Sequence, residues 1–246
     1  MHSKPFIHAL ALALALAGSS GPVRADIPPG PPPTPRPVVK PAPAPAPTLE
    51  AAVAGVEGFY RKVTDFKANF TQEVRRAHLP RPLKKSGKVF FKAPGKMRWD
   101  YTQPERVYYV SDGDILWSYE QETQQCVKMR VAESELYDSL KFLFGQGDLK
   151  GSFDITAASA EAGLVGLKLV PKKNQSNYKS LTLFADAKTF EIRRTELVDP
   201  LDNVSVITFE APTYEALKDD GFKFKPPKGA NVQDLTGHAP GGAVKP

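Results

Sequence analysis

The chain has 246 residues, of which 33 are Lys or Arg and 27 are Asp or Glu, so its formal net charge is +6. Most of this excess lies at the two ends, because residues 48–236 carry 28 basic and 26 acidic side chains. A nucleic-acid-binding protein concentrates its basic residues on the folded domain, so we expect no nucleic acid among the partners. The single cysteine, Cys126, excludes an intramolecular disulfide and any site built from several thiolates.

Residue patterns that would support catalysis are sparse. His78 is the only histidine of residues 48–236, and it lies in the basic stretch 75–85, which we interpret as an exposed loop. The sequence contains neither a G-x-x-x-x-G-K-[ST] phosphate loop nor a G-x-S-x-G nucleophile turn. The glycines of 145–151 have the wrong spacing for a dinucleotide fingerprint. We therefore expect no enzyme, no cofactor and no metal site, although carboxylate pairs that the fold brings together stay open.

The N-terminus has the layout of a secretory signal peptide. Lys4 gives a positive start, residues 9–17 form an apolar run of nine, and Val23 and Ala25 are small residues just before Asp26. The run is far shorter than the roughly 20 apolar residues that span a bilayer. We expect residues 1–25 to be removed on export, and no cysteine lies near the cleavage point to carry a lipid anchor.

The next segment is dominated by proline, since 13 of the 24 prolines precede residue 48. Proline lacks the amide hydrogen that helices and sheets use, so we expect a disordered, extended linker. Its role stays open between a spacer that gives reach and an incidental leader. The expected organisation is a signal peptide (1–25), a Pro-rich linker (26–47), a folded domain (48–235) and a disordered tail (236–246).

Two stretches of the folded domain have helical periodicity. Thr48 is a candidate N-cap, and the apolar side chains that follow it recur three and four residues apart, which predicts an amphipathic helix. These apolar residues are Leu49, Val53, Val56, Tyr60 and Val63. A second helix is predicted over Ser134–Phe144, before Gly145. Its apolar stripe consists of Leu136, Leu140, Leu143 and Phe144.

Almost everything else alternates between apolar and polar residues with a period of two, which is typical of strands. Met97, Trp99 and Tyr101 are one such set, and turn-forming residues at 93–95, 111–114, 172–177 and 199–203 separate such runs. We count about eleven short strands and no long crossover of the kind that a parallel sheet needs. The pattern predicts an antiparallel sheet.

Several of these strands are apolar at both parities, for example around Phe90, Tyr108 and Thr208. A strand with one face in water alternates cleanly, so something must cover much of both faces. A curved sheet that wraps around the two helices accounts for part of this, and the remaining apolar interior is a candidate cavity. Ordinary packing of a core is the alternative, and periodicity alone does not decide between the two.

Several blocks of the sequence resemble one family of proteins. The blocks are Phe66–Gln72, Gly87–Pro104, Val110–Tyr119 and Phe222–Val232, in this order along the chain. They are similar to the periplasmic outer-membrane lipoprotein carriers of the LolA family. The resemblance extends over about residues 48–235, which is nearly the whole of the expected folded domain.

The resemblance implies a mainly β fold with an α lid: an unclosed antiparallel half-barrel of about eleven strands around an apolar cavity that the helices cover. It implies a monomeric carrier in the periplasm whose cargo is the acyl chains of lipoproteins. The implied partners are an inner-membrane ABC transporter that releases lipoproteins and an outer-membrane receptor that accepts them. We expect the lipid-binding residues to be Phe70, Met97, Trp99, Tyr101, Trp117, Leu140, Leu143 and Phe144.

One position departs from the family pattern. The best-known members carry an arginine before the proline of the turn at 93–95, and this arginine is thought to latch the lid, whereas this chain has Ala93. Lys92 and Arg98 are the next residues to consider as a latch.

Two other classes of function remain beside the carrier. A half-barrel of this kind also suits a periplasmic sensor or regulator that binds a lipid or a peptide, although the tail after residue 236 is too short for the extra domain that such a protein would need. A periplasmic enzyme acting on lipid or peptidoglycan is the third hypothesis, and the missing nucleophile is the main objection to it.

Overall fold

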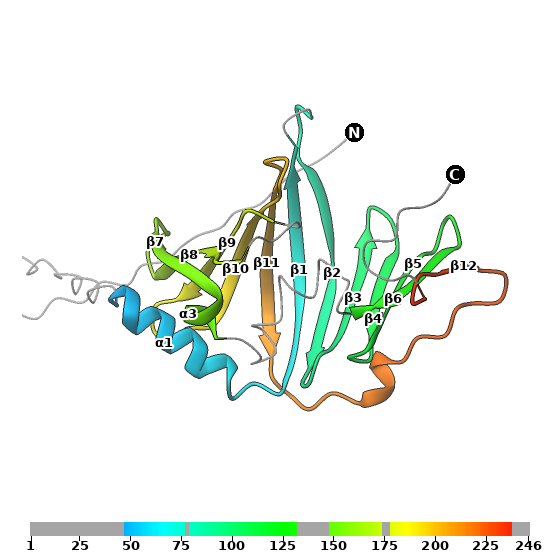
Figure 1. Cartoon of the computed structure of the whole chain (residues 1–246), viewed down its shortest axis with the longest axis horizontal. Helices are drawn as coiled ribbons and strands as arrows, with labels where there is room; N and C mark the ends of the chain where they lie inside the picture. The colour runs from blue at the N-terminus through cyan, green and yellow to red at the C-terminus, as the bar shows by residue number, and fades with distance from the viewer. Residues whose placement is uncertain (1–46, 77–78, 132–147, 174–177, 238–246) are drawn as a thin grey trace, which may run out of the picture. The chain divides into compact units, whose positions relative to one another are not determined.

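Twelve strands form one sheet in the computed structural model, which describes residues 47–76, 79–131, 148–173 and 178–237 (Figure 1). The first six strands are β1 (Asp65–Arg75), β2 (Leu83–Lys92), β3 (Lys96–Gln103), β4 (Val107–Ser111), β5 (Ile115–Glu120) and β6 (Gln125–Arg130). The others are β7 (Phe153–Ala158), β8 (Leu164–Pro171), β9 (Ser180–Asp186), β10 (Ile192–Val198), β11 (Val204–Thr213) and β12 (Asn231–Asp234). The helices are α1 (Leu49–Tyr60), α3 (Leu149–Ser152) and the 3-10 turn η3 (Asp219–Phe222).

The strand order is β12-β6-β5-β4-β3-β2-β1-β11-β10-β9-β8-β7, so β12 and β7 are the two free edges and the sheet is unclosed. Neighbouring strands are antiparallel except β12, which pairs with β6 in parallel. The predicted antiparallel, mainly β architecture is confirmed. The extra parallel strand was not predicted, because the chain reaches it only after crossing half the sheet from β11 (Figure 1).

Helix α1 begins as predicted, since the Ala51 amide donates to Thr48 Oγ1 over 3.3 Å. The helix ends at Tyr60 and does not continue to Val63, because the chain turns there to enter β1. Gly55 allows a close approach, as a methyl group at this position would clash with the ring of Phe190. The predicted helix Ser134–Phe144 lies outside the described residues, as do residues 1–46 and most of the tail.

The two faces of the sheet follow from the pairing register. We call inner face the side that carries Phe66, Phe70 and Trp99, and outer face the opposite side. The buried side of α1 belongs to the same hydrophobic cluster as the inner-face residues. Tyr60 of this helix is anchored to the sheet, because its hydroxyl accepts a hydrogen bond from the Ile192 amide over 3.1 Å.

The outer face of β3–β6 is covered by the chain that follows β11. We call Leu217–Lys225 the C-terminal strap. Phe224 packs on the rings of Trp117 and Tyr119, with centroids 5.7 and 5.9 Å away, and Phe222 is buried. The strap therefore covers the rings on the outer face of β5, and Tyr108 of β4 stacks on Tyr119 with a centroid distance of 6.2 Å. For β4, core packing accounts for the apolar residues at both parities without a cavity.

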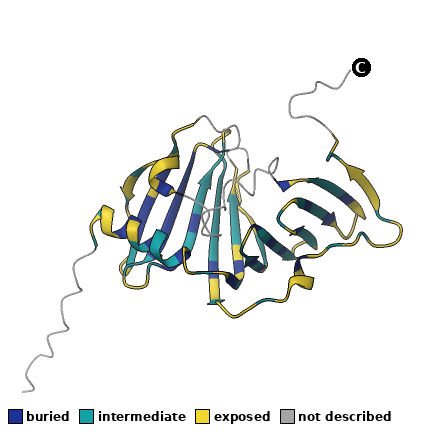
Figure 2. Cartoon of the chain, turned by 60° about the horizontal axis from the view of Figure 1, so that its bottom comes forward, coloured by how far each residue is buried: buried dark blue, intermediate teal, exposed yellow. Residues whose placement is uncertain are grey.

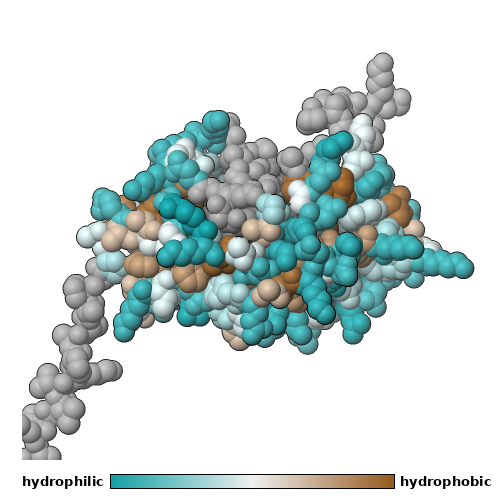
Figure 3. All heavy atoms as spheres, turned by 90° about the horizontal axis from the view of Figure 1, so that it is seen from below, coloured by the Kyte–Doolittle hydropathy of each residue, from teal (hydrophilic) through white to brown (hydrophobic). Residues whose placement is uncertain are grey.

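Burial is concentrated in the strands and along one side of α1 (Figure 2). The edge strand β12 is exposed at all four residues. The end of the sheet that Figure 3 shows from below carries mainly hydrophilic side chains around scattered apolar ones. No helix of the described residues is both long enough and apolar enough to cross a bilayer.

Candidate functional site

An aromatic cluster on the inner face of β1–β3 is the centre of the candidate site. The Phe70 ring meets the rings of Trp99 and Tyr101 edge to face, with centroids 4.8 and 4.9 Å away. Gly87 lies between Phe70 and Tyr101 in the register of β1, β2 and β3. A side chain at Gly87 would clash with the backbone of Asp100, so glycine is required where the two rings meet across β2.

The cluster continues across the middle of the sheet into its other half. Phe209 of β11 lies 5.7 Å from Phe66 and 6.5 Å from Trp99, measured between ring centroids. Beyond it the inner face is aliphatic. The buried residues of this part are Leu167, Leu169, Leu181, Leu183 and Ile192. One apolar surface thus extends from β3 to β8.

The aromatic cluster of this surface carries two polar groups that bear on binding. Trp99 is 1% exposed, and its Nε1 atom is one of two buried side-chain polar atoms of the described residues that have no hydrogen-bond partner. Burial raises the pKa of Tyr101 above its usual value, and the neighbouring Tyr109 adds to the shift. The Tyr101 hydroxyl is therefore neutral under physiological conditions and can donate a hydrogen bond.

Four of the predicted lipid-binding residues share the inner face: Phe70, Met97, Trp99 and Tyr101. Met97 is fully buried, and Phe91 of β2 lies directly opposite it in the register. The predicted residues Leu140, Leu143 and Phe144 lie outside the described residues.

Trp117 is placed differently from the prediction. It pairs with Val110, which pairs with Arg98, so all three side chains lie on the outer face. There Trp117 packs on Phe224, and Lys128 Nζ lies 5.8 Å from the centre of its ring. Trp117 therefore does not share a surface with Trp99, since the register places the residues on opposite faces.

Ala93 sits at the turn between β2 and β3, where its amide donates to the Thr64 carbonyl over 2.7 Å. It is thus next to the connection from α1 to β1, and a latch role for this position stays a prediction. Lys92 and Arg98 are engaged on the outer face, because Lys92 Nζ donates to Leu217 O over 2.6 Å and Arg98 Nη1 donates to Gly221 O over 3.1 Å. These two cations hold the strap and are not placed to latch a lid on the inner face.

Sequence reasoning missed the aliphatic half of the site, although Leu181 and Leu183 alternate as expected of a strand. The alternation of Leu181 and Leu183 indicates one apolar face of β9. Combined with the pairing of β9 to β8 and β10, it could have indicated the aliphatic half. Phe209 gave no separate signal, because β11 is apolar at both parities and its face could not be assigned from sequence.

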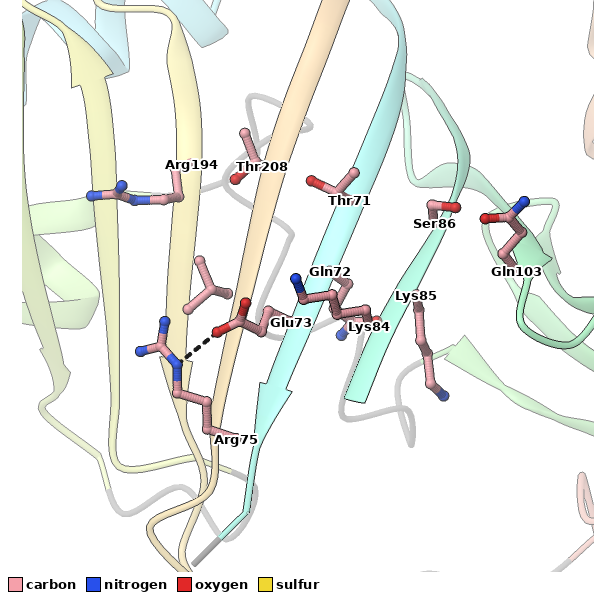
Figure 4. Close-up of a pocket in the computed structure, with 11 residues that line it drawn as sticks. Thr71, Gln72, Glu73, Arg75, Lys84, Lys85, Ser86, Gln103, Arg194 and Thr208 are labelled. Atoms are coloured by element: carbon pink, nitrogen blue, oxygen red, sulfur yellow. Dashed lines mark hydrogen bonds and ion pairs between the residues drawn. The ribbon is translucent and has the colours of Figure 1, made fainter. Parts of the chain in front are cut away.

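A separate groove of about 510 Å³ lies at β1, β2, β10 and β11 (Figure 4). Its side chains are mainly polar, among them Thr71, Glu73, Lys84 and Arg194. Arg194 binds Glu161 through two hydrogen bonds of 2.7 and 3.0 Å, which hold the pKa of this carboxyl below its usual value. This polar lining does not suit an acyl chain. Among the described residues no group of three or more His, Cys, Asp or Glu side chains is placed to hold a metal ion.

Comparison with known proteins agrees with this geometry. The family model described as "Outer membrane lipoprotein carrier protein LolA" matches residues 61–225. The chain belongs to the LolA family. The outer-membrane lipoprotein carrier protein of Nitrosomonas europaea is 31% identical over 183 residues, which are 74% of this chain and 88% of that protein.

A second carrier protein and a solved structure are also similar to this chain. The carrier protein of Methylococcus capsulatus is 30% identical over 72% of this chain and 85% of its own length. Among solved structures, the LolA superfamily protein NE2245 of Nitrosomonas europaea aligns with a TM-score of 0.43 and 13% identity, over 73% of this chain and 99% of that one. The family is one of carriers, which agrees with the expectation that the chain is not an enzyme.

Proposed function

We propose that this chain carries lipoproteins through the periplasm by binding their acyl chains on the inner face. The observation that carries the proposal is the continuous apolar surface from Trp99 to Leu167 on a sheet whose edges do not close. The family supports the cargo, since the relatives are named outer-membrane lipoprotein carriers. The signal-peptide pattern of residues 1–25 supports the periplasm.

The need for such a surface follows from the cost of moving acyl chains through water. Each methylene contributes about 0.8 kcal/mol, so a chain of about 16 carbons costs about 13 kcal/mol to hold in water. A carrier that crosses an aqueous compartment must offset most of this cost. It must also release the chain, and the flexible Met97 suits loose, adaptable contact.

Trp99 Nε1, which has no hydrogen-bond partner among the described residues, adds a feature that acyl chains alone do not use. A buried donor without an acceptor costs about 1 to 3 kcal/mol. The ester or amide carbonyl that joins an acyl chain to its lipoprotein is a suitable acceptor. We propose that Trp99 Nε1 donates to such a carbonyl, which would place the acyl chain along the inner face with its polar end at the aromatic cluster.

The partners of the proposed cycle are an inner-membrane ABC transporter that loads the carrier and an outer-membrane receptor that unloads it. The sequence has no phosphate-binding loop of its own. The direction of transfer must therefore come from the energy source of the transporter and from a receptor with higher affinity.

A solubility experiment tests the proposal. The purified chain is mixed with a triacylated lipoprotein in the absence of detergent, and the mixture is centrifuged and separated by size. We expect the lipoprotein to stay in the supernatant as a complex with this chain. The control is the same lipoprotein without its acyl chains, which should not bind. Equal binding of both forms, or aggregation of the acylated form despite the carrier, would contradict the proposal.

A further inference from the structure

The end of the sheet where β1 turns into β2 combines exposed apolar and basic side chains. We call this surface the basic rim and define it by Arg75, Arg76, Leu79, Arg81, Leu83, Lys84 and the neighbouring Leu201. Leu201 belongs to the turn between β10 and β11, and Arg75 pairs with Val204 just after that turn. In Figure 1 the β1–β2 connection projects beyond the ends of the neighbouring strands.

The apolar part of the basic rim consists of three leucines. Leu79, Leu83 and Leu201 are 43%, 39% and 77% exposed, and they are three of the six large hydrophobic side chains that the described residues expose. Single exposed apolar residues are normal on a protein surface. Three that gather at one projecting end, among cations, indicate a contact surface.

The basic part is largely free of counter-charges. Arg76, Arg81 and Lys84 are exposed and form no ion pair among the described residues, although Glu73 lies opposite Lys84 in the register. Arg75 is paired with Glu73 over 2.8 Å. The two carboxylates of the adjacent turn are engaged locally, because Asp202 pairs with Lys179 over 2.7 Å.

The second of these carboxylates, Asp199, accepts hydrogen bonds of 2.8 Å from the amides of Leu201 and Asn203. Asp199 keeps its charge, but among the described residues neither carboxylate of the turn forms an ion pair with Arg76, Arg81 or Lys84. The basic rim keeps a local excess of positive charge.

The basic rim adjoins the inner face. Leu83 pairs with Val74, and both lie on the inner face like Phe70. Lys85 lies on this face too, and its Nζ is 5.7 Å from the centre of the Tyr101 ring. A surface that touches the basic rim would therefore lie next to the aromatic cluster.

We propose that the basic rim docks this protein on the surface of a bilayer that contains anionic phospholipid. Basic side chains are attracted to anionic headgroups, and leucines beside them enter the boundary between headgroups and acyl chains. The groove beside Arg75 and Lys84 is lined mainly by polar side chains and offers no apolar pocket, whereas the exposed leucines of the projecting end can meet a flat surface. Docking would bring the inner face to the place where acyl chains leave or enter the membrane.

The test measures binding of the purified chain to vesicles of phosphatidylglycerol and phosphatidylcholine, with vesicles of phosphatidylcholine alone for comparison. These vesicles contain no acylated protein, so the result does not depend on the proposed cargo. The variant Arg76→Ala/Arg81→Ala/Lys84→Ala should bind the anionic vesicles about 100-fold more weakly, because each basic side chain near the surface contributes roughly a factor of five. Binding of the unchanged protein should weaken at high salt, since screening acts on exposed charges.

The matched control removes three exposed lysines away from the basic rim. Lys188→Ala/Lys218→Ala/Lys225→Ala has the same net charge and should bind like the unchanged protein. All variants share one N-terminus, so any contribution of that segment cancels. Leu79→Ser/Leu201→Ser should weaken binding about tenfold at unchanged charge.

Equal losses in the two triple variants, or equal binding to both kinds of vesicle, would overturn the proposal. No binding to anionic vesicles would also overturn it and would leave an acidic protein surface as the partner of the basic rim. The Arg76/Arg81/Lys84 variant should still form the complex with the acylated lipoprotein in solution, which separates a failure of docking from a failure of cargo binding.

Discussion

The two tryptophans of the chain show how differently the two faces of the sheet are used. Trp117 lies on the outer face, where Phe224 of the same chain covers it. Trp99 lies on the inner face, fully buried, with a ring nitrogen that has no hydrogen-bond partner among the described residues. The outer surface is completed by the protein's own strap, whereas the inner surface holds a polar group that a ligand can satisfy.

This contrast teaches that apolar composition alone does not identify a binding surface. Both faces carry aromatic residues in adjoining strands, and both Trp99 and Trp117 are packed against other rings of the chain. They differ in what buries them and in whether their polar atoms are paired. Variants that affect one face and leave the other intact can therefore test the assignment.

The largest effect is expected from a charge on the inner face. Met97→Glu places a carboxylate among apolar side chains, which should weaken acyl binding about 100-fold and lower the free energy of unfolding by about 4 kcal/mol. Binding is measured with an acylated peptide and stability by denaturant unfolding. Met97→Gln, which adds no charge, tests the same position should the first variant not fold.

The matched control is Asn69→Glu on the outer face of β1, where the residue is exposed and lies between Lys88 of β2 and Glu210 of β11, so the attraction of one neighbour offsets the repulsion of the other. It should bind the acylated peptide normally and unfold at nearly unchanged denaturant concentration. If Met97→Glu bound as well as Asn69→Glu does, the inner face would not be the cargo surface.

An intermediate effect is expected from the outer face. Phe224→Ala removes the ring that packs on Trp117 and Tyr119, and should lower the free energy of unfolding by about 2 kcal/mol. Acyl binding by the folded variant should stay unchanged. Loss of binding at unchanged stability would show that the strap takes part in cargo recognition and would break the contrast between the faces.

A smaller effect is expected from the anchor of the strap at Asp65. Burial of this carboxyl opposes its ionisation, but the amide of Leu217, the side chain of Thr64 and the charge of Lys92 together hold its pKa below the usual value. The Leu217 amide donates over 3.0 Å. A depressed pKa stabilises the fold at pH values above the unfolded pKa of about 3.9, and this contribution is lost as the pH falls through the lower folded value.

Asp65→Asn should therefore lower the free energy of unfolding by about 1.5 kcal/mol near neutral pH. As the pH falls below about 4, the variant should lose less stability than the unchanged protein. The measurement is the free energy of unfolding as a function of pH. The same acid dependence in both proteins would mean that Asp65 does not anchor the strap through its charge.

Much of the fold could be predicted from the sequence because its signals are local. The N-cap at Thr48, the turns at 93–95 and 199–203, and the shared face of Met97 and Trp99 depend on neighbouring residues only. The end of α1 was less predictable, because the helical pattern continues to Val63 while the chain must already turn towards β1.

The face of Trp117 could not be predicted, since it depends on register across two hairpins. A shift of one residue moves every side chain of a strand to the other face. The strap was equally hidden, because Phe222 and Phe224 come about ten residues after the last long strand and meet β3–β6 only in three dimensions. The same limit applies to Lys92 and Arg98, whose partners Leu217 and Gly221 are more than 120 residues away.

The most direct test of the central claim uses the fluorescence of the two tryptophans, which are the only ones in the chain. Trp117→Phe leaves Trp99 as the sole emitter, and Trp99→Phe leaves Trp117. Each variant is titrated with an acylated peptide and with the same peptide lacking its acyl chain. The account predicts a shift of Trp99 emission with the acylated peptide only, and unchanged Trp117 emission with either. A shift of Trp117 while Trp99 stays unchanged would contradict it, because the cargo would then lie on the outer face.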